Sequence, residues 1–317
     1  MTKFKDIHES YKAGDITRLE AAMQFHQIHQ RLFQYRELLQ RAGGGRIQIL
    51  QDHVILTTAR GAIFIVDEQD VRSNPIEYLN FGTLEGVDER VFLELCNRSE
   101  VIVDIGANIG WYSIHAARLN PNLKNIYAFE PLPQNLALLK NNIDLNKPYS
   151  DRIIVHSCAL GDRNGYRDLL SSEEEKGASS FFNIRDLQEP LVSNVEVRRL
   201  DEVSLDWGEL GEKSLLKIDT EGSEYLVLLG AMSFLAENRP VVFCEILRKW
   251  SAKAGVDYNA SVKLLTDIGY EVFTTIAGSD GLHTFSVIDE TTEATNFFFF
   301  PREKISNYIR SGACKIY

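Results

Sequence analysis

Residues Val101–Gly110 read VIVDIGANIG, a short apolar run that leads directly into an aspartate and two glycines. An apolar run of this length is typical of a buried parallel β-strand that delivers a binding turn. Gly106 and Gly110 carry no Cβ atom and can adopt positive φ, so the backbone there can approach a bulky ligand closely. This stretch therefore predicts a strand followed by a ligand-binding turn.

Strand-like and helix-like segments alternate after this stretch. Strands are expected at 101–105, 125–130, 152–160, 214–219 and 240–246, helices near 109–119, 133–146, 222–236 and 259–268, and a buried last strand in the run NFFFF. Such alternation predicts an α/β fold, with a mostly parallel sheet and helices on both faces.

Two smaller regions come before the predicted sheet. Residues 1–45 have helical spacing, with Asp15 as the expected N-cap and a Gly-Gly-Gly stop at 43–45, and form a lid or a dimer element. Residues 46–86 contain short strands that predict an antiparallel hairpin or meander and a connecting loop. The ligand-binding domain then covers 87–301, and 302–317 form a C-terminal tail.

Composition limits the classes of partner. The net charge of −11 argues against nucleic acid and against an anionic membrane surface, because both attract clustered Lys and Arg. The N-terminus shows no apolar secretory segment, and the four cysteines have no C-x-x-C spacing. We expect a cytoplasmic protein with free thiols, without nucleic acid or membrane as a partner.

The residues of the turn distinguish between two classes of cofactor. A nicotinamide-binding G-x-G-x-x-G fingerprint would need glycines at 104, 106 and 109, but the chain has Asp104, Gly106 and Ile109 there. A carboxylate at the strand end suits a ligand with a cationic group rather than a pyrophosphate. S-adenosylmethionine, which carries an ammonium and a sulfonium, is such a ligand.

Two later strand ends supply candidate contacts for a nucleoside. Glu130 ends the second strand, 20 residues after Gly110, where a carboxylate can accept both hydroxyls of a ribose. The third strand ends in the small and apolar residues Cys158-Ala159-Leu160, which suit an adenine pocket. Asp162, just beyond them, could accept from the exocyclic amine of the base.

Acidic residues also mark the fourth and fifth strands. Asp219 and Glu221 alternate at a strand end and therefore point the same way, and Glu245 interrupts the apolar run VVFCEIL. A buried carboxylate needs a partner, so these three acids are expected at the cleft. They could deprotonate a substrate hydroxyl, orient it, or share a divalent cation, and the sequence leaves these three roles open.

The motifs VIVDIGANIGWYS, IYAFEP, ALGDRNG, LLKIDTEGSE and VVFCEI, in this order over about residues 85–301, resemble the FkbM-type family of S-adenosylmethionine-dependent methyltransferases. The resemblance implies a class I methyltransferase sheet of seven strands with the last strand antiparallel. It also implies methyl transfer to a hydroxyl of a sugar or natural product. By the same resemblance Asp104, Gly106, Asn108 and Gly110 shape the methionine side of the cofactor site. Glu130 then takes the ribose, and Asp219 faces the cofactor amine or the acceptor.

The sequence thus predicts an O-methyltransferase in which Glu245 or Asp219 is the base. The sequence leaves two other functions open. One is a non-catalytic module that binds S-adenosylmethionine or S-adenosylhomocysteine with a protein partner, and the other is a nicotinamide-dependent enzyme, which the missing glycines disfavour. The expected partners are a small hydroxyl acceptor and a second copy bound through the N-terminal helices. Residues 1–84, 173–186 and 277–290 are expected to select the acceptor.

Overall fold

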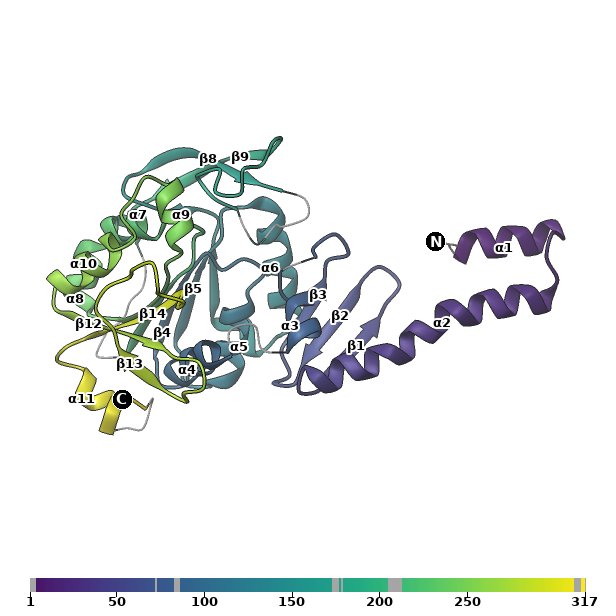
Figure 1. Cartoon of the computed structure of the whole chain (residues 1–317), viewed down its shortest axis with the longest axis horizontal. Coiled ribbons are helices and arrows are strands. Elements are labelled where there is room, and N and C mark those ends of the chain that lie inside the picture. The colour runs from purple at the N-terminus through teal and green to yellow at the C-terminus, as the bar shows by residue number, and fades with distance from the viewer. Residues whose placement is uncertain are drawn as a thin grey trace.

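An eight-stranded sheet forms the centre of the molecule (Figure 1). The computed structural model describes residues 4–71, 73–82, 86–172, 177, 179–204, 213–310 and 315–316. The strands of the sheet, in spatial order, are β13 (Leu282–Thr284), β12 (Tyr270–Thr275), β14 (Asn296–Pro301), β11 (Val241–Glu245), β10 (Ser214–Ile218), β4 (Val101–Ile105), β5 (Asn125–Phe129) and β6 (Ile153–His156).

The strand directions match the predicted fold class. β11, β10, β4, β5 and β6 pair in parallel, and the last strand β14 lies antiparallel between β11 and β12. The short strand β13 pairs antiparallel with β12 and adds an eighth strand at the edge. The predicted mostly parallel α/β sheet with an antiparallel last strand is therefore confirmed, with one edge strand more than the seven expected.

Apolar side chains cover both faces of this sheet because successive residues of a strand point to opposite sides. Ile102 of β4 belongs to a core cluster on one face, and its neighbour Val103 belongs to the cluster on the other. The helices that cover the first face are α4 (Val87–Cys96), α5 (Trp111–Leu119) and α6 (Pro133–Leu145), and those that cover the second are α7 (Glu224–Leu229), α8 (Met232–Asn238) and α10 (Ala260–Asp267).

The other elements surround this body. The remaining helices are α1 (Phe4–Ala13), α2 (Arg18–Arg41), α3 (Ile76–Phe81), α9 (Arg248–Lys253) and α11 (Ile305–Arg310), with short 3₁₀ turns at Tyr149–Arg152 and Leu200–Glu202. Two three-stranded sheets are present, β1 (Gly45–Ile49), β2 (Val54–Thr58) and β3 (Ile63–Val66), and β7 (Ala159–Leu160), β9 (Leu191–Arg198) and β8 (Gly165–Ser171). The helical hairpin α1–α2 projects away from the body as an arm (Figure 1).

Side-chain amides attach the β1–β3 meander to the body. The side-chain oxygens of Asn142 on α6 and of Asn146, the C-cap of α6, accept from the backbone amides of Ile65 and Ile63 at 2.9 and 3.0 Å. Asn146 also donates to the carbonyl of Ile63 at 2.7 Å. These contacts satisfy the free edge of β3, because a strand edge otherwise leaves its backbone groups unpaired.

Three local predictions were wrong. Helix α2 is capped by Thr17 rather than Asp15, because Thr17 and Glu20 form a reciprocal capping box. The strand expected over 152–160 divides into β6 and β7, which belong to different sheets. The helix expected over 222–236 is two helices, α7 and α8, separated at Gly230 and Ala231.

The structure also bears on the thiols and on the membrane prediction. Cys96, Cys158 and Cys244 are buried and free, and Cys314 lies outside the described residues. None of the described helices combines the length and the apolar character needed to cross a bilayer.

The turn after β4 has a strict requirement for glycine. Gly106 has φ +77°, and a Cβ atom there would overlap the backbone carbonyl oxygen of Asp219. We predict that Gly106→Ala lowers the free energy of unfolding by about 3 kcal/mol or more, because it combines left-handed backbone with a clash. Denaturant titration measures this loss.

The matched control is Gly255→Ala. Gly255 also has positive φ, +71°, but nothing lies within 4 Å of the position of a Cβ atom. The Gly255→Ala substitution should lower the free energy of unfolding by only about 1 kcal/mol. Equal losses in the two variants would show that the close approach of Asp219 to Gly106 does not constrain the fold.

Candidate active site

A cavity of about 70 Å³ lies at the carboxyl ends of the central strands, beside the turns that follow β4 and β10. Ligands of open α/β sheets bind at this end. Of the predicted site residues, those that line the cavity are Gly106, Asn108, Glu130, Ala159, Asp219 and Glu221, whereas Asp104, Gly110, Asp162 and Glu245 are not among its described lining residues.

The segment after β8 contributes to the same cavity. Gly177, Ser179 and Phe181 complete its wall, and the Ser180 hydroxyl donates to the carbonyl of Glu221 at 2.6 Å. Typical small-molecule sites hold about 300–1,000 Å³, so the cavity in this conformation accepts only part of a nucleoside-sized ligand. Part of the predicted 173–186 loop therefore lies at the site, although 173–176 and 178 fall outside the described residues.

The turn after β4 is held by backbone hydrogen bonds. The amides of Gly106 and Ala107 both donate to the carbonyl of Phe129, at 3.0 and 2.9 Å. Gly110, with φ +88°, caps α5, and a Cβ there would crowd the side chain of Leu139. The two glycines thus make room for the protein's own atoms, and only Gly106 also reaches the cavity.

A buried chain of charges connects the ends of β4 and β10. The ammonium of Lys217 lies 3.4 Å from Asp104 Oδ1 and 3.2 Å from Asp219 Oδ2. Asp104 also accepts from the Ser113 hydroxyl at 2.6 Å, and the Lys217 ammonium lies 4.9 Å from the centre of the Tyr112 ring. The cationic partner of Asp104 among the protein's side chains is therefore Lys217.

Lys217 was not assigned a role from the sequence. Its signal was present, because a lysine inside the apolar strand SLLKI must find a carboxylate once it is buried. Its side chain is 2% exposed, and that of Asp104 is 1% exposed. Asp219 is 32% exposed, so the charge chain leads from the core to the cavity wall.

Glu130 forms a second buried acid at the end of β5. Its Oε2 accepts from the amide of Asn108 at 2.8 Å, and its Oε1 accepts from the amide of Leu132 at 2.9 Å. Burial raises the pKa of Glu130 to about 7, although these two amides act in the opposite direction. The Asn135 side chain also hydrogen-bonds to this carboxylate, and both residues line the cavity.

Three carboxylates converge at the ends of β10 and β11. Asp219, Glu221 and Glu245 each offer an oxygen within 4.8 Å of the others. Burial and the charge of Asp219 raise the pKa of Glu221 well above its usual range, while Arg185 and Lys249 act in the opposite direction. Such a cluster can share a proton, orient a hydroxyl, or bind a divalent cation through its oxygens.

A fourth acid keeps this turn in shape. Oε1 of Glu224 accepts from the amides of Thr220 and Gly222 and from the Thr220 hydroxyl, each at 3.0 Å. The turn includes Glu221 at φ +54°, a conformation uncommon for a residue other than glycine. Glu224 therefore has a structural role, since it holds Glu221 in this conformation.

The apolar end of the cavity lies beside β7. Ala159 lines it together with Cys158, Leu160 and Leu169. Asp162 lies farther on, where its backbone carbonyl accepts from Arg199 at 2.6 Å and its carboxylate is 4.0 Å from Arg163. The structure thus brings Ala159 to the cavity and leaves Asp162 outside its described lining.

Known proteins resemble this chain over the same region. "Methyltransferase 1" of Beauveria bassiana is 26% identical over 190 residues, which cover 53% of this chain and 74% of that protein. The 31-O-demethyl-FK506 methyltransferase FkbM of Streptomyces tacrolimicus is 25% identical over 190 residues, covering 49% of this chain and 71% of that protein.

A solved structure and a domain profile complete the comparison. The methyltransferase FkbM structure from Methylobacillus flagellatus KT is 20% identical, with a TM-score of 0.42, and the match covers 64% of this chain but only 44% of that one. The profile of the methyltransferase FkbM domain matches residues 104–272, from the Asp104 turn to β12. The chain therefore belongs to the FkbM family of methyltransferases.

Proposed function

We propose that the protein transfers a methyl group from S-adenosylmethionine to a hydroxyl of a small molecule, a sugar or a natural product. Membership of the FkbM family supports the methyl transfer. The methyltransferase FkbM of Streptomyces tacrolimicus, whose name specifies a 31-O-demethyl substrate, supports an oxygen as the acceptor atom. The observation that carries the proposal in this chain is the position of Glu130.

The surroundings of Glu130 fit the ribose of the cofactor. Its carboxylate is held by two backbone amides and the Asn135 side chain, and it lines the cavity. Two neighbouring hydroxyls on a ribose can donate to such a pair of oxygens. The apolar surface around Ala159 is then available to the base, and Asp219 to the cationic end.

Proton transfer is the step for which the protein's own residues are needed. S-adenosylmethionine, when bound, supplies an electrophilic methyl group on a sulfonium. An acceptor hydroxyl that attacked this methyl would have to release its proton, and a nearby carboxylate would accept it. Asp219 is already engaged by the Lys217 ammonium, so we assign the base to Glu245, with Glu221 beside it.

The first test measures how binding depends on the ionisation of Glu130. The pKa of about 7 means that only part of the protein has the ionised acceptor at neutral pH. We expect the affinity for S-adenosylhomocysteine to rise about tenfold between pH 6 and pH 8, because the ionised fraction of Glu130 rises from about one tenth to about nine tenths over this range. Calorimetric titration measures this change.

The control is Glu130→Gln. It should bind S-adenosylhomocysteine at least tenfold more weakly at pH 8 and lose the pH dependence, because a neutral amide keeps the shape but not the charge. In the protein without ligand, ionisation of Glu130 has the opposite effect, because it lowers the stability of the fold. The folded pKa lies above the ordinary 4.5, so wild-type stability should fall relative to the variant from about pH 4.5 to 7. Equal affinities of the two proteins, or stronger binding of NAD than of S-adenosylhomocysteine, would contradict the ribose assignment.

The second test addresses the base. Glu245→Gln should reduce turnover by about 10²–10⁴-fold, the usual contribution of a general base, and change S-adenosylhomocysteine affinity less than threefold. Glu237→Gln, an exposed acid on α8, is the matched control and should keep full activity. Turnover is measured by mass spectrometry, as methyl groups gained by compounds of a metabolite extract.

Three outcomes would argue against this mechanism. Full turnover in both Glu245→Gln and Glu221→Gln would exclude the carboxylate pair as the base. Activity lost with a chelator and restored by Mg²⁺ would give the acid cluster a cation instead. Binding of S-adenosylhomocysteine without methylation of any acceptor would favour the non-catalytic module.

We also propose that the arm formed by α1 and α2 pairs with a second copy of the chain. Apolar residues recur on α2 at alternating steps of four and three, at Ala21, Phe25, Ile28, Leu32, Tyr35 and Leu39. This heptad spacing is the self-complementary pattern of a coiled coil. Helix α1 covers only the first part, where Phe4 stacks on Phe25 at 5.9 Å, and Leu32 remains 51% exposed.

A charge on this seam should separate the copies. We predict that Leu32→Glu on the seam, combined with Phe33→Glu beside it, where the side chain is 75% exposed, converts a dimer into a monomer in sedimentation velocity. Gln27→Glu, at an exposed polar position of the same helix, should leave the dimer intact. A wild-type protein that stays monomeric when its concentration is raised 100-fold would contradict the pairing.

A further inference from the structure

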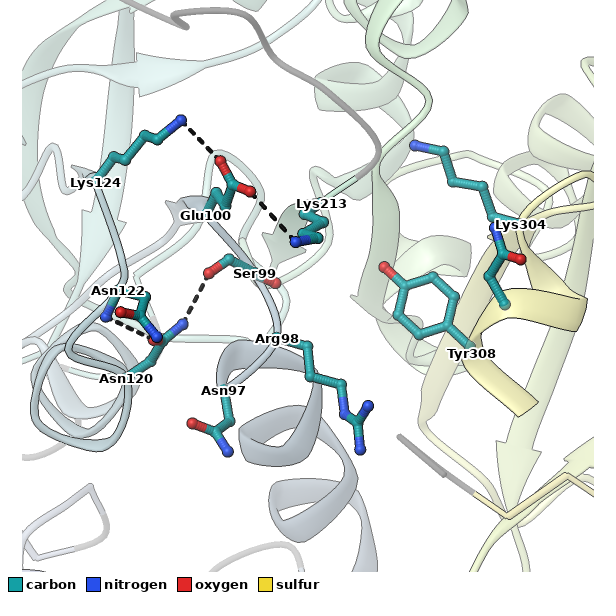
Figure 2. A pocket seen from close by; sticks show the side chains of 11 residues that line it. Asn97, Arg98, Ser99, Glu100, Asn120, Asn122, Lys124, Lys213, Lys304 and Tyr308 are labelled. Carbon is teal, nitrogen blue, oxygen red and sulfur yellow. Dashed lines mark hydrogen bonds and ion pairs between the residues drawn. The ribbon is translucent and has the colours of Figure 1, made fainter. Parts of the chain in front are cut away.

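A second cavity, called here the amino-end cavity, lies at the amino ends of the central strands, opposite the candidate active site. It has a volume of about 600 Å³ and is lined by residues that directly precede strands β4, β5 and β10 (Figure 2). Glu100, Lys124 and Lys213 are the last residues before these three strands. Lys304 and Tyr308, from the turn after β14 and from α11, form the other side.

The two cavities are well separated. The central strands have five residues each, and a strand rises about 3.3 Å per residue, so about 17 Å of sheet lies between the amino-end cavity and the turns that hold Asp104 and Asp219. The cavities share no lining residue. A ligand of the amino-end cavity would therefore leave the cofactor site open.

The amino-end cavity is positively charged in an acidic protein. Among the described residues its lining holds four cations, Arg98, Lys124, Lys213 and Lys304, and one acid, Glu100, which leaves three positive charges in excess. The whole chain has a net charge of −11. Cations gathered in a concave site focus the field and attract anions despite the overall charge.

The ion pairs within the lining do not cancel this excess. Glu100 lies 2.7 Å from the Lys124 ammonium and 3.4 Å from that of Lys213, and the two lysines lower the pKa of Glu100, which stays ionised. One carboxylate thus binds two ammonium groups, one on each oxygen, as Figure 2 shows. Among the described residues the guanidinium of Arg98 makes no hydrogen bond or ion pair, so its five donors can serve a ligand.

The size of the cavity and its neutral side chains further limit the class of ligand that it can bind. A volume of about 600 Å³ exceeds the space of one phosphate and falls within the range of small-molecule sites. The Tyr308 ring and the side-chain amides of Asn97 and Asn307 also line it, and amides donate well to phosphate oxygens. A guanidinium suits phosphate through paired donors.

We propose that this cavity binds a small molecule carrying two or more phosphate groups, with Arg98, Lys124 and Lys213 as its main contacts. A single phosphate would neutralise only part of the charge. A membrane surface is flat and would not reach into a cavity bounded by α11 on one side and the loops before β4 and β5 on the other.

The experiment is calorimetric titration of the full chain with inorganic tripolyphosphate at low salt and at 300 mM salt. We expect one equivalent to bind, with an affinity that falls as salt screens the charges. Saturating S-adenosylhomocysteine should leave the stoichiometry unchanged, because the two cavities are separate. Competition by S-adenosylhomocysteine would place the anion in the cofactor site and overturn the proposal.

A pair of double variants tests the assigned contacts. Arg98→Gln with Lys213→Gln should weaken tripolyphosphate binding at least tenfold. Lys140→Gln with Lys263→Gln removes the same charge from exposed positions on α6 and α10 and should change binding less than twofold. Equal losses in the two proteins, no binding by the wild type at millimolar tripolyphosphate, or binding to anionic vesicles without binding to tripolyphosphate would each overturn the proposal.

Discussion

The buried ion pairs of Lys217 are the interaction on which the site depends. Lys217 and Asp104 stand opposite each other in the register of β10 and β4, in the middle of a sheet covered on both faces. An unpaired charge there would cost several kcal/mol, so each requires the other. Because Lys217 also holds Asp219, the same contact fixes the turn after β10 beside the turn after β4. The cavity lies between these two turns.

Two buried acids at the same edge of the sheet, Asp104 and Glu130, have different surroundings. Asp104 has a cation at 3.4 Å and serves the structure, whereas Glu130 is held by two backbone amides and the Asn135 side chain, and burial raises its pKa to about 7. At the end of β10, burial and the neighbouring charge of Asp219 raise the pKa of Glu221. Carboxyl groups in such different surroundings are suited to different roles in binding and proton transfer.

Local patterns in the sequence were enough to predict the sheet and most of the cavity wall. Apolar runs ending in Asp, Glu or Gly located β4, β5 and β10, and these ends place Gly106, Glu130 and Asp219 at the cavity. The partner of Asp104 could not be predicted, because it depends on the register between strands more than 100 residues apart in the chain. The amino-end cavity was missed for the same reason: its cations come from loops that are distant in sequence and carry no motif. The N-cap of α2, by contrast, could have been predicted correctly, since Thr17 and Glu20 have the spacing of a capping box.

The central claim is that Glu130 holds the ribose of the cofactor at the end of β5, and a crystal structure of the protein with S-adenosylhomocysteine tests it most directly. The account predicts both ribose hydroxyls within about 3 Å of the Glu130 carboxylate, and the thioether sulfur facing Asp219, Glu221 and Glu245. A nucleoside bound at another edge of the sheet, or a ribose with no contact to Glu130, would contradict it.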